Sequence, residues 1–172
     1  MEGEERVTRA DGGIDRAVDR TADRPLWTCP SCGHRFVTAN LWHSCSRHTV
    51  DEHFARADPR VREAFDRLVQ LYEGCGPIVV IAQKTRIAFM VRVRFGGCTV
   101  RRDRLLTAIS LARRVDHARW TSIEELAPGW IAHHLVVRHA DELADPELAA
   151  LICESYHDIG EQGRLRHRSS TR

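Results

Sequence analysis

Hydrophobic residues recur with helical spacing after Asp58. Asp58 is a good N-cap residue and Pro59 is favoured in the first turn. The apolar residues that follow share one helical face: Val61, Phe65, Leu68, Val69 and Tyr72. The run Gly74–Pro77 ends the pattern. Asp145 and Pro146 repeat the cap signal before a second amphipathic stretch with Leu148, Leu151, Ile152 and Tyr156. The chain therefore predicts two helices, one at each end of its central region.

Between these helices the apolar period changes to two, which indicates β-strands. Residues 78–81 are a continuous apolar run, typical of a strand covered on both faces, and 86–94 alternate apolar and polar positions. Gly96-Gly97 predicts a turn. Further strands are expected at 98–100, 105–111 and 130–137, the last after an irregular link around Pro128-Gly129. Short links favour antiparallel pairing. We expect an α+β fold: an antiparallel sheet of about five strands, covered by two helices, behind a small zinc-ribbon-like or finger-like unit.

The chain divides into four predicted parts. They are a disordered leader (1–25), a zinc-binding segment (26–50), an α+β domain (51–160) and a flexible tail (161–172), with 50–57 as a connector. The 172 residues, 42% of them hydrophobic, suit one domain with small additions. No apolar run is long enough to cross a membrane, and the leader lacks the apolar stretch of a secretory signal. These features predict a cytoplasmic protein.

Six cysteines in such a compartment are expected to stay reduced. Cys75, Cys98 and Cys153 are isolated within apolar patterns, and free cysteine packs as a small hydrophobic residue. We therefore expect these three to be ordinary core residues and the other cysteines to be metal ligands.

Cysteine and histidine residues between 29 and 48 have the spacing of one tetrahedral zinc site. Two ligand sets are open: Cys29, Cys32, His43 and Cys45, or the same three cysteines with His48 in place of His43. The segment is too small to bury a core, so metal binding would supply its folding energy. Three thiolates weaken the Lewis acidity of the ion, and no helical zinc-protease motif is present, which favours structural Zn²⁺ over catalytic zinc or a redox Cys-x-x-Cys pair.

Positive charge is concentrated in the middle of the chain. The net charge is +2, but residues 84–119 hold ten basic and two acidic residues, or +8, which leaves −6 for the remainder. In the strand 86–94, Ile87, Phe89, Val91 and Val93 are expected to face the helices. The opposite face would then hold Lys84, Arg86, Arg92 and Arg94 around Ala88 and Met90, with the predicted turn at Arg101, Arg102 and Arg104 widening the basic surface. Guanidinium groups bind phosphate bidentately, so this face is a candidate anion or nucleic-acid site; the alternative is an ordinary solvated sheet face.

Two further observations bear on function. The predicted cationic face lacks aromatic residues on which the bases of a single strand could stack. This disfavours single-strand binding and leaves binding to the phosphate backbone of a duplex. His133 and His134 lie in one strand, so one must point inward and one outward. An enzyme hypothesis would use Lys84 as a base or amine beside one of these histidines. No nucleophile elbow, phosphate loop or paired-carboxylate motif supports it.

Two motif clusters resemble the bacterial DUF5655 proteins. The first contains Trp27, Cys29, Pro30, Cys32, Gly33 and Phe36, then His43-Ser44-Cys45 and Glu52-His53-Phe54. The second contains Gly76-Pro77, Gln83–Phe89 and Arg94-Phe95, followed by Asp141–Leu143 and Tyr156. The resemblance covers roughly residues 27–158. It implies a small cytosolic α+β domain with a zinc-ribbon-like extension, in a family without an established activity, and it favours His43 over His48 as a ligand.

The leading hypothesis is a non-enzymatic binding module for an anionic polymer, nucleic acid before phosphorylated protein. A second hypothesis is a small-molecule enzyme or ligand carrier with a pocket near Lys84, Arg86 and His133. A third is a protein-interaction adaptor, whose sign would be an exposed apolar patch.

Overall fold

The computed structural model describes residues 25–37, 39–40, 43 and 48–162. A hairpin of β1 (Trp27–Thr28) and β2 (Arg35–Phe36) precedes the helices α1 (Val50–Phe54) and α2 (Pro59–Cys75). Six strands follow: β3 (Val79–Ala82), β4 (Ile87–Met90), β5 (Arg94–Val100), β6 (Leu105–Leu111), β7 (Ser122–Ala127) and β8 (Trp130–Val137). The 3-10 helix η1 (Ala140–Leu143), the helix α3 (Pro146–Glu154) and the π-helix η2 (Ser155–Gly160) close the described chain. Most of the predicted leader and tail lies outside the described residues.

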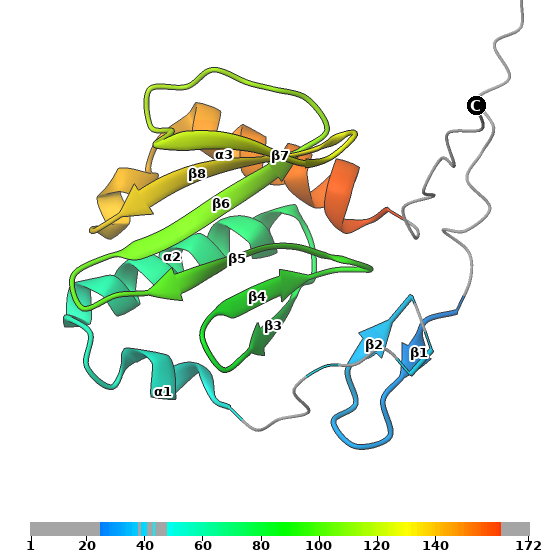
Figure 1. Cartoon of the computed structure of the whole chain (residues 1–172). Coiled ribbons are helices and arrows are strands. Elements are labelled where there is room, and N and C mark those ends of the chain that lie inside the picture. The colour runs from blue at the N-terminus through cyan, green and yellow to red at the C-terminus, as the bar shows by residue number, and fades with distance from the viewer. Residues whose placement is uncertain (1–24, 38, 41–42, 44–47, 163–172) are drawn as a thin grey trace, which may run out of the picture.

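The six strands form one antiparallel sheet in the order β3-β4-β5-β6-β8-β7. The helices α2 and α3 lie behind this sheet in Figure 1. The main core lies between these layers and includes Phe65, Leu68 and Tyr72 of α2 together with Phe89 and Ile109 of the sheet. The predicted α+β architecture with helices on one sheet face is confirmed.

The predicted helices and two of the predicted strands match the structure closely. Asp58 caps α2, since its side chain accepts from the Arg60 N–H, and Asp145 caps α3 in the same way. The strands β6 and β8 have the predicted bounds. The edge strand β3 is covered on both faces, as predicted: Val80 packs against the main core, and Ile81 packs against the β1–β2 hairpin.

Two predictions about connections were wrong. The predicted connector contains α1, whose N-cap Thr49 and N3 residue Glu52 form a capping box. The predicted link before β8 contains β7, which pairs with β8 and makes the sheet six-stranded rather than five-stranded. β7 carries acidic residues at Glu124 and Glu125 and is mostly exposed, so it lacks the apolar alternation that marks a half-buried strand.

The turn between β4 and β5 also differs from the prediction. Gly96 and Gly97 lie within β5, and the chain reverses instead at residues 91–93. The carbonyl of Gly160 accepts hydrogen bonds from the N–H groups of Arg92 and Val93, so the end of η2 holds this turn. Gly97 has φ +152°, and a Cβ there would lie 2.3 Å from the carbonyl oxygen of Ile87. Glycine is needed here for close strand contact and not for a turn.

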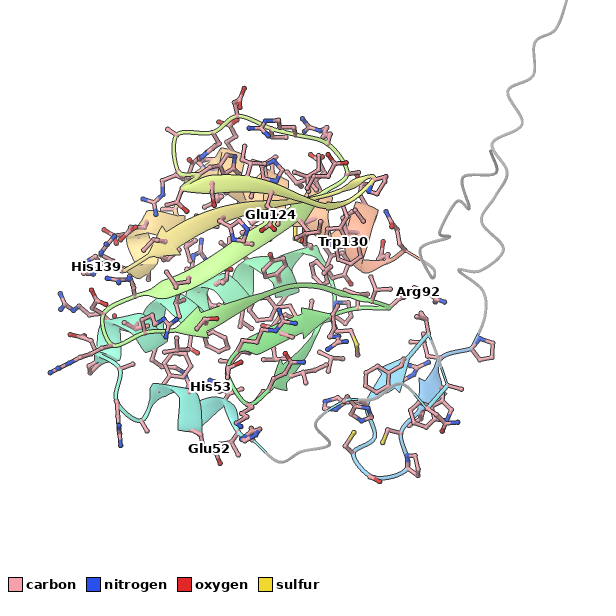
Figure 2. The ribbon with its side chains drawn as sticks, viewed as in Figure 1. Glu52, His53, Arg92, Glu124, Trp130 and His139 are labelled. Atoms are coloured by element: carbon pink, nitrogen blue, oxygen red, sulfur yellow. A yellow bond between two sulfur atoms is a disulfide. The ribbon has the colours of Figure 1, made fainter. Side chains whose placement is uncertain are left out.

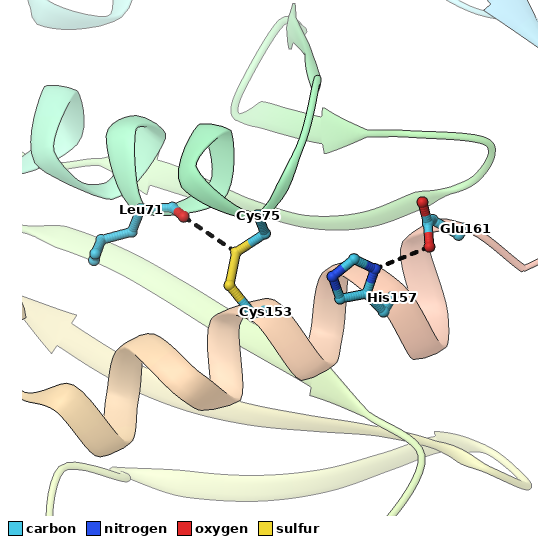
Figure 3. Close-up of a disulfide and its surroundings, with 5 residues drawn as sticks. All are labelled: Leu71, Cys75, Cys153, His157 and Glu161. Atoms are coloured by element: carbon cyan, nitrogen blue, oxygen red, sulfur yellow. Dashed lines mark hydrogen bonds and ion pairs between the residues drawn. A yellow bond between two sulfur atoms is a disulfide. The ribbon is translucent and has the colours of Figure 1, made fainter.

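The prediction that Cys75 and Cys153 are unpaired core residues was wrong. They form a disulfide between the end of α2 and α3, across 78 positions of sequence (Figure 3). Cys98 is a free, buried cysteine as predicted, and burial raises the pKa of its thiol to about 12. Among the described helices, none has both the length and the apolar character needed to span a bilayer.

Candidate functional site

The β1–β2 hairpin carries the candidate metal ligands. Its turn is closed by two backbone hydrogen bonds, from the Cys29 N–H to the His34 carbonyl and from the Gly33 N–H to the Cys29 carbonyl. Gly33 has φ +72°, a left-handed conformation that glycine adopts without steric cost. The Cys-Pro-Ser-Cys-Gly sequence thus forms a tight turn that brings the Cys29 and Cys32 thiols to one side.

His43 completes a group of three donors with these cysteines. The ligand atoms of Cys29, Cys32 and His43 all lie within 4.8 Å of one another, and Cys32 Sγ is 3.1 Å from His43 Nε2. The His43 ring also packs on Phe36, with ring centroids 4.5 Å apart. Two thiols and an imidazole at this separation can all contact one metal ion, since ligand bonds to zinc are about 2.0–2.3 Å long. The residues present fit a metal ion.

Of the two predicted ligand sets, both contain Cys45, and they differ in using His43 or His48. Cys45 lies outside the described residues. His48 is not part of the three-donor group, and its Nδ1 lies 3.4 Å from a carboxylate oxygen of Glu52 at the start of α1. The described residues therefore bring His43, and not His48, to Cys29 and Cys32.

The hairpin is also packed against the sheet. Buried Cys29 and Phe36 form a small hydrophobic cluster with Ile81 of β3 and with Ala88 and Met90 of β4. Ala88 and Met90 were predicted to lie among cations on the outer sheet face. They do point outward, but they are buried beneath the hairpin rather than solvated. The β1–β2 hairpin and His43 together form what we call the candidate metal unit. This unit thus covers the β3–β4 end of the outer sheet face.

The four predicted cations do not form one row. Lys84 is exposed in the turn between β3 and β4, and Arg92 lies in the β4–β5 turn, beside Phe36 and Val37 of the hairpin (Figure 2). Arg86 directly precedes β4, and Arg94 begins β5. The structure brings Arg86 and Arg94 to a common hollow that Lys84 and Arg92 do not line.

This hollow lies on the outer face of the sheet and has a volume of about 460 Å³. Small side chains form much of its surface because glycine, alanine and serine occupy successive outward positions on neighbouring strands: Ala88, Gly97, Ala108, Ser110 and Ala132. Its lining includes Arg86, Arg94 and His134, and none of its described lining residues is a carboxylate. The hollow is therefore positively charged and polar on one side, with an apolar floor.

Partial burial gives Arg94 the less favourable environment for a positive charge of the two arginines. Burial, and then repulsion from the nearby Arg86 guanidinium, lower the pKa of Arg94 from its usual value. Arg86 is held by a hydrogen bond from its Nε–H to Gln83 Oε1, at 2.8 Å. A bound anion would offset both the desolvation and the repulsion.

Trp130 is a residue that the sequence reasoning missed. It lines the hollow from the start of β8, where β7 and β8 meet (Figure 2), and it also packs against the main core. The prediction that aromatic side chains are lacking on the cationic face was therefore wrong. Trp130 lies 36 positions after Arg94 in sequence, on a strand that the sheet order places two strands away. Trp130 and His134 are four positions apart in one strand, so they lie on the same sheet face, and this spacing could have revealed Trp130 in the sequence.

The two adjacent histidines have opposite orientations, as predicted. His133 is fully buried on the helix side, where its Nε2 accepts from the Val115 N–H and its Nδ1 lies 3.2 Å from the Ile131 carbonyl oxygen. Burial lowers its pKa. His134 lines the hollow and lies 3.6 Å from Glu124. Because His133 is enclosed and Lys84 is exposed in a turn, the structure does not bring these two residues together for catalysis.

Comparison with known proteins gives one match. A family model described as "Domain of unknown function (DUF5655)" matches residues 50–159. The chain belongs to the DUF5655 family. The match spans the region from the start of α1 almost to the end of η2, so the candidate metal unit lies before the part of the chain that this DUF5655 match covers. No curated protein and no solved structure matches the chain.

Proposed function

We propose that this DUF5655 protein is a non-catalytic binding module for single-stranded nucleic acid, stabilised by a structural zinc ion in its N-terminal hairpin. The observation that carries the proposal is the hollow in which Arg86 and Arg94 share one surface with Trp130. Arginine binds backbone phosphate through parallel N–H donors, and an indole ring offers a stacking surface to any base. The combination suits a strand whose bases are free to stack.

Charge and shape both support this assignment. The absence of carboxylates among the described lining residues leaves the positive charge of Arg86 and Arg94 available to a phosphate. The floor of glycine and alanine lets a flat base approach the sheet closely. The hydrophobic cluster beneath the hairpin contains sheet residues of β3 and β4, at one end of the strand order, whereas the hollow extends from β4 to β8.

Zinc is the metal we propose because of the donor set. Thiolate ligands select soft or borderline ions, and mixed Cys/His sets are typical of structural zinc sites. Cys29, Cys32 and His43 would hold the ion together with Cys45, as the spacing predicts. When bound, the ion cross-links the hairpin, and the packing of Cys29 and Phe36 on Met90 transmits that order to the sheet.

Fluorescence anisotropy with a labelled single strand of about twelve nucleotides tests the proposal, since a typical site covers about 4–16 nucleotides. We expect binding that weakens between about 50 and 200 mM salt. The double variant Arg86→Gln/Arg94→Gln should bind at least about tenfold more weakly, and its salt slope should fall by about 1.4, or about 0.7 for each lost phosphate contact.

The matched control is Arg67→Gln/Arg114→Gln, which removes the same charge from residues outside the hollow. It should retain most of the affinity. No binding at low salt would refute the proposal, as would an equal loss in the control variant, because that result would show a response to net charge alone.

The hollow also favours a second candidate, a small anionic ligand. Its volume of about 460 Å³ is in the range of small-molecule sites, about 300–1,000 Å³. A mononucleotide that binds as tightly as the oligonucleotide would favour this candidate. The adaptor hypothesis finds less support: among the described residues, Leu126 is the one large hydrophobic side chain that is exposed.

A further inference from the structure

A second cationic depression lies on the other side of the β5–β6 turn. We call it the α1 notch. It has a volume of about 490 Å³ and is lined by the C-terminal part of α1, the link to α2 and the end of β5: His53, Arg56, Ala57, Val100, Arg101 and Arg102. Figure 2 shows His53 on the side of α1 nearer the sheet and Glu52 on the opposite side. None of the described residues that line the notch is acidic.

The arginines of the α1 notch differ from their neighbours in pairing. The nearby carboxylates are taken by other cations: Asp51 by Arg62, Asp58 by Arg60, and Asp103 by Arg104. Glu52 accepts from the Thr49 N–H and contacts His48. Within the described chain, the guanidinium groups of Arg56, Arg101 and Arg102 have no carboxylate partner. The fold therefore neutralises the cations around the notch and leaves those inside it unneutralised.

Backbone hydrogen bonds fix the elements that present these cations. The Asp58 N–H donates to the Arg102 carbonyl at 2.7 Å, which ties the α1–α2 link to the β5–β6 turn. The Arg101 N–H donates to the Arg104 carbonyl at 2.8 Å and closes the turn itself. Arg56 and Arg102 thus converge from segments far apart in sequence because the backbone of Asp58, two residues after Arg56, is bonded to that of Arg102.

The α1 notch and the hollow lie on opposite faces of the end of β5. Thr99 lines the hollow, and its neighbour Val100 lines the notch, since successive residues of a strand point to opposite faces. The exposed turn residues Arg101 and Arg102 line the notch and directly follow Val100 at this end of the strand. A ligand that passes over this turn can contact both.

We propose that the α1 notch is a phosphate-binding site in which Arg56, Arg101 and Arg102 hold a phosphate oxyanion beside His53. Three like charges around one depression repel one another, and a phosphate group removes that repulsion while it accepts charge-assisted hydrogen bonds. The site goes beyond the proposed function because it stands on residues outside the hollow. Its phosphate can come from a nucleic-acid backbone or from a small phosphate ester.

Inorganic phosphate is the first probe, titrated at constant ionic strength into the full, zinc-loaded chain. NMR observes the arginine Nε–H signals one residue at a time. We expect saturable shifts of Arg56, Arg101 and Arg102, with a dissociation constant of about 1–10 mM, the strength of a few exposed charge-assisted contacts. Arg101→Gln/Arg102→Gln should abolish saturation, and so should Arg56→Gln on a separate element. Arg67→Gln/Arg114→Gln should leave it unchanged. Shifts that never saturate, or that persist in both notch variants, would overturn the site.

The oligonucleotide is the second probe and separates this inference from the proposed function. If Arg101→Gln/Arg102→Gln weakens strand binding by about fivefold or more while the control does not, the phosphate belongs to the nucleic acid. If the strand does not bind but inorganic phosphate still saturates the notch signals, the proposed function fails and the notch stands as a site for a small phosphate ester. If the strand binds but neither probe responds to the notch variants, this inference alone is wrong.

Discussion

Replacing Cys75 and Cys153 with alanine removes the covalent link between α2 and α3 that Figure 3 shows. The linked residues are 78 positions apart in sequence. In the chain-entropy account, a cross-link around a loop of this length restricts the unfolded chain by about 4.5 kcal/mol. Both cysteines are only half-buried, so the loss of their sulfur atoms adds little to this value. We expect the free energy of unfolding to fall by about 3–4.5 kcal/mol, because compact unfolded states reduce the entropic effect.

Urea unfolding followed by circular dichroism measures this difference, with zinc present in excess throughout. The melting temperature should fall by roughly 6–18 °C, at about 2–4 °C per kcal/mol for a chain of this size. The matched control is the single variant Cys75→Ala, which breaks the cross-link as fully as the double variant. It should therefore be destabilised to the same extent within about 0.5 kcal/mol. A double variant within about 1 kcal/mol of the native protein would refute the reasoning, and so would alkylation of Cys75 and Cys153 in the unreduced, unfolded protein.

Three further predictions concern the hairpin, the β4–β5 contact and the start of α2. Elemental analysis should find one zinc ion per chain, and Cys32→Ser should lower zinc affinity by at least about tenfold, because it removes one of the three grouped donors; full occupancy in the variant would contradict the site. Gly97→Ala should destabilise the fold by about 2 kcal/mol or more in urea unfolding, because its Cβ would lie 2.3 Å from the Ile87 carbonyl oxygen. The control Gly74→Ala, at a helical position with open space, should be neutral or slightly stabilising. Hydrogen bonds from the Arg60 side chain and backbone lower the pKa of the Asp58 carboxyl to about 2. Its contribution to stability should be complete above the ordinary pKa near 3.8 and should be lost as the pH falls toward 2, so Asp58→Asn should flatten the acid limb of the stability profile in this window.

The candidate site was predictable only in part, and the limit follows from how its residues are brought together. The Cys-x-x-Cys spacing by itself indicated a metal ligand pair, since a tight turn fixes both thiols locally. Alternation placed Arg86 and Arg94 on one face of a single strand, but they meet across a reversal at residues 91–93, on neighbouring strands. The place of Trp130 in the same hollow as Arg94 could not be predicted in this way, because it depends on the sheet order β5-β6-β8. The same reason explains why no sequence pattern revealed the α1 notch: its arginines meet through a hydrogen bond between Asp58 and Arg102.

The sequence by itself determined the elements whose stability is local. The caps at Asp58 and Asp145 and the apolar periods that follow them placed α2 and α3. Alternation placed β6 and β8. Each of these signals depends only on residues a few positions apart in the chain. Only the tertiary structure decided the β4–β5 turn, the exposed strand β7 and the Cys75–Cys153 disulfide. Each of these depends on partners far away in the chain, such as the Gly160 carbonyl that holds the turn, and such contacts exist only after the layers have packed.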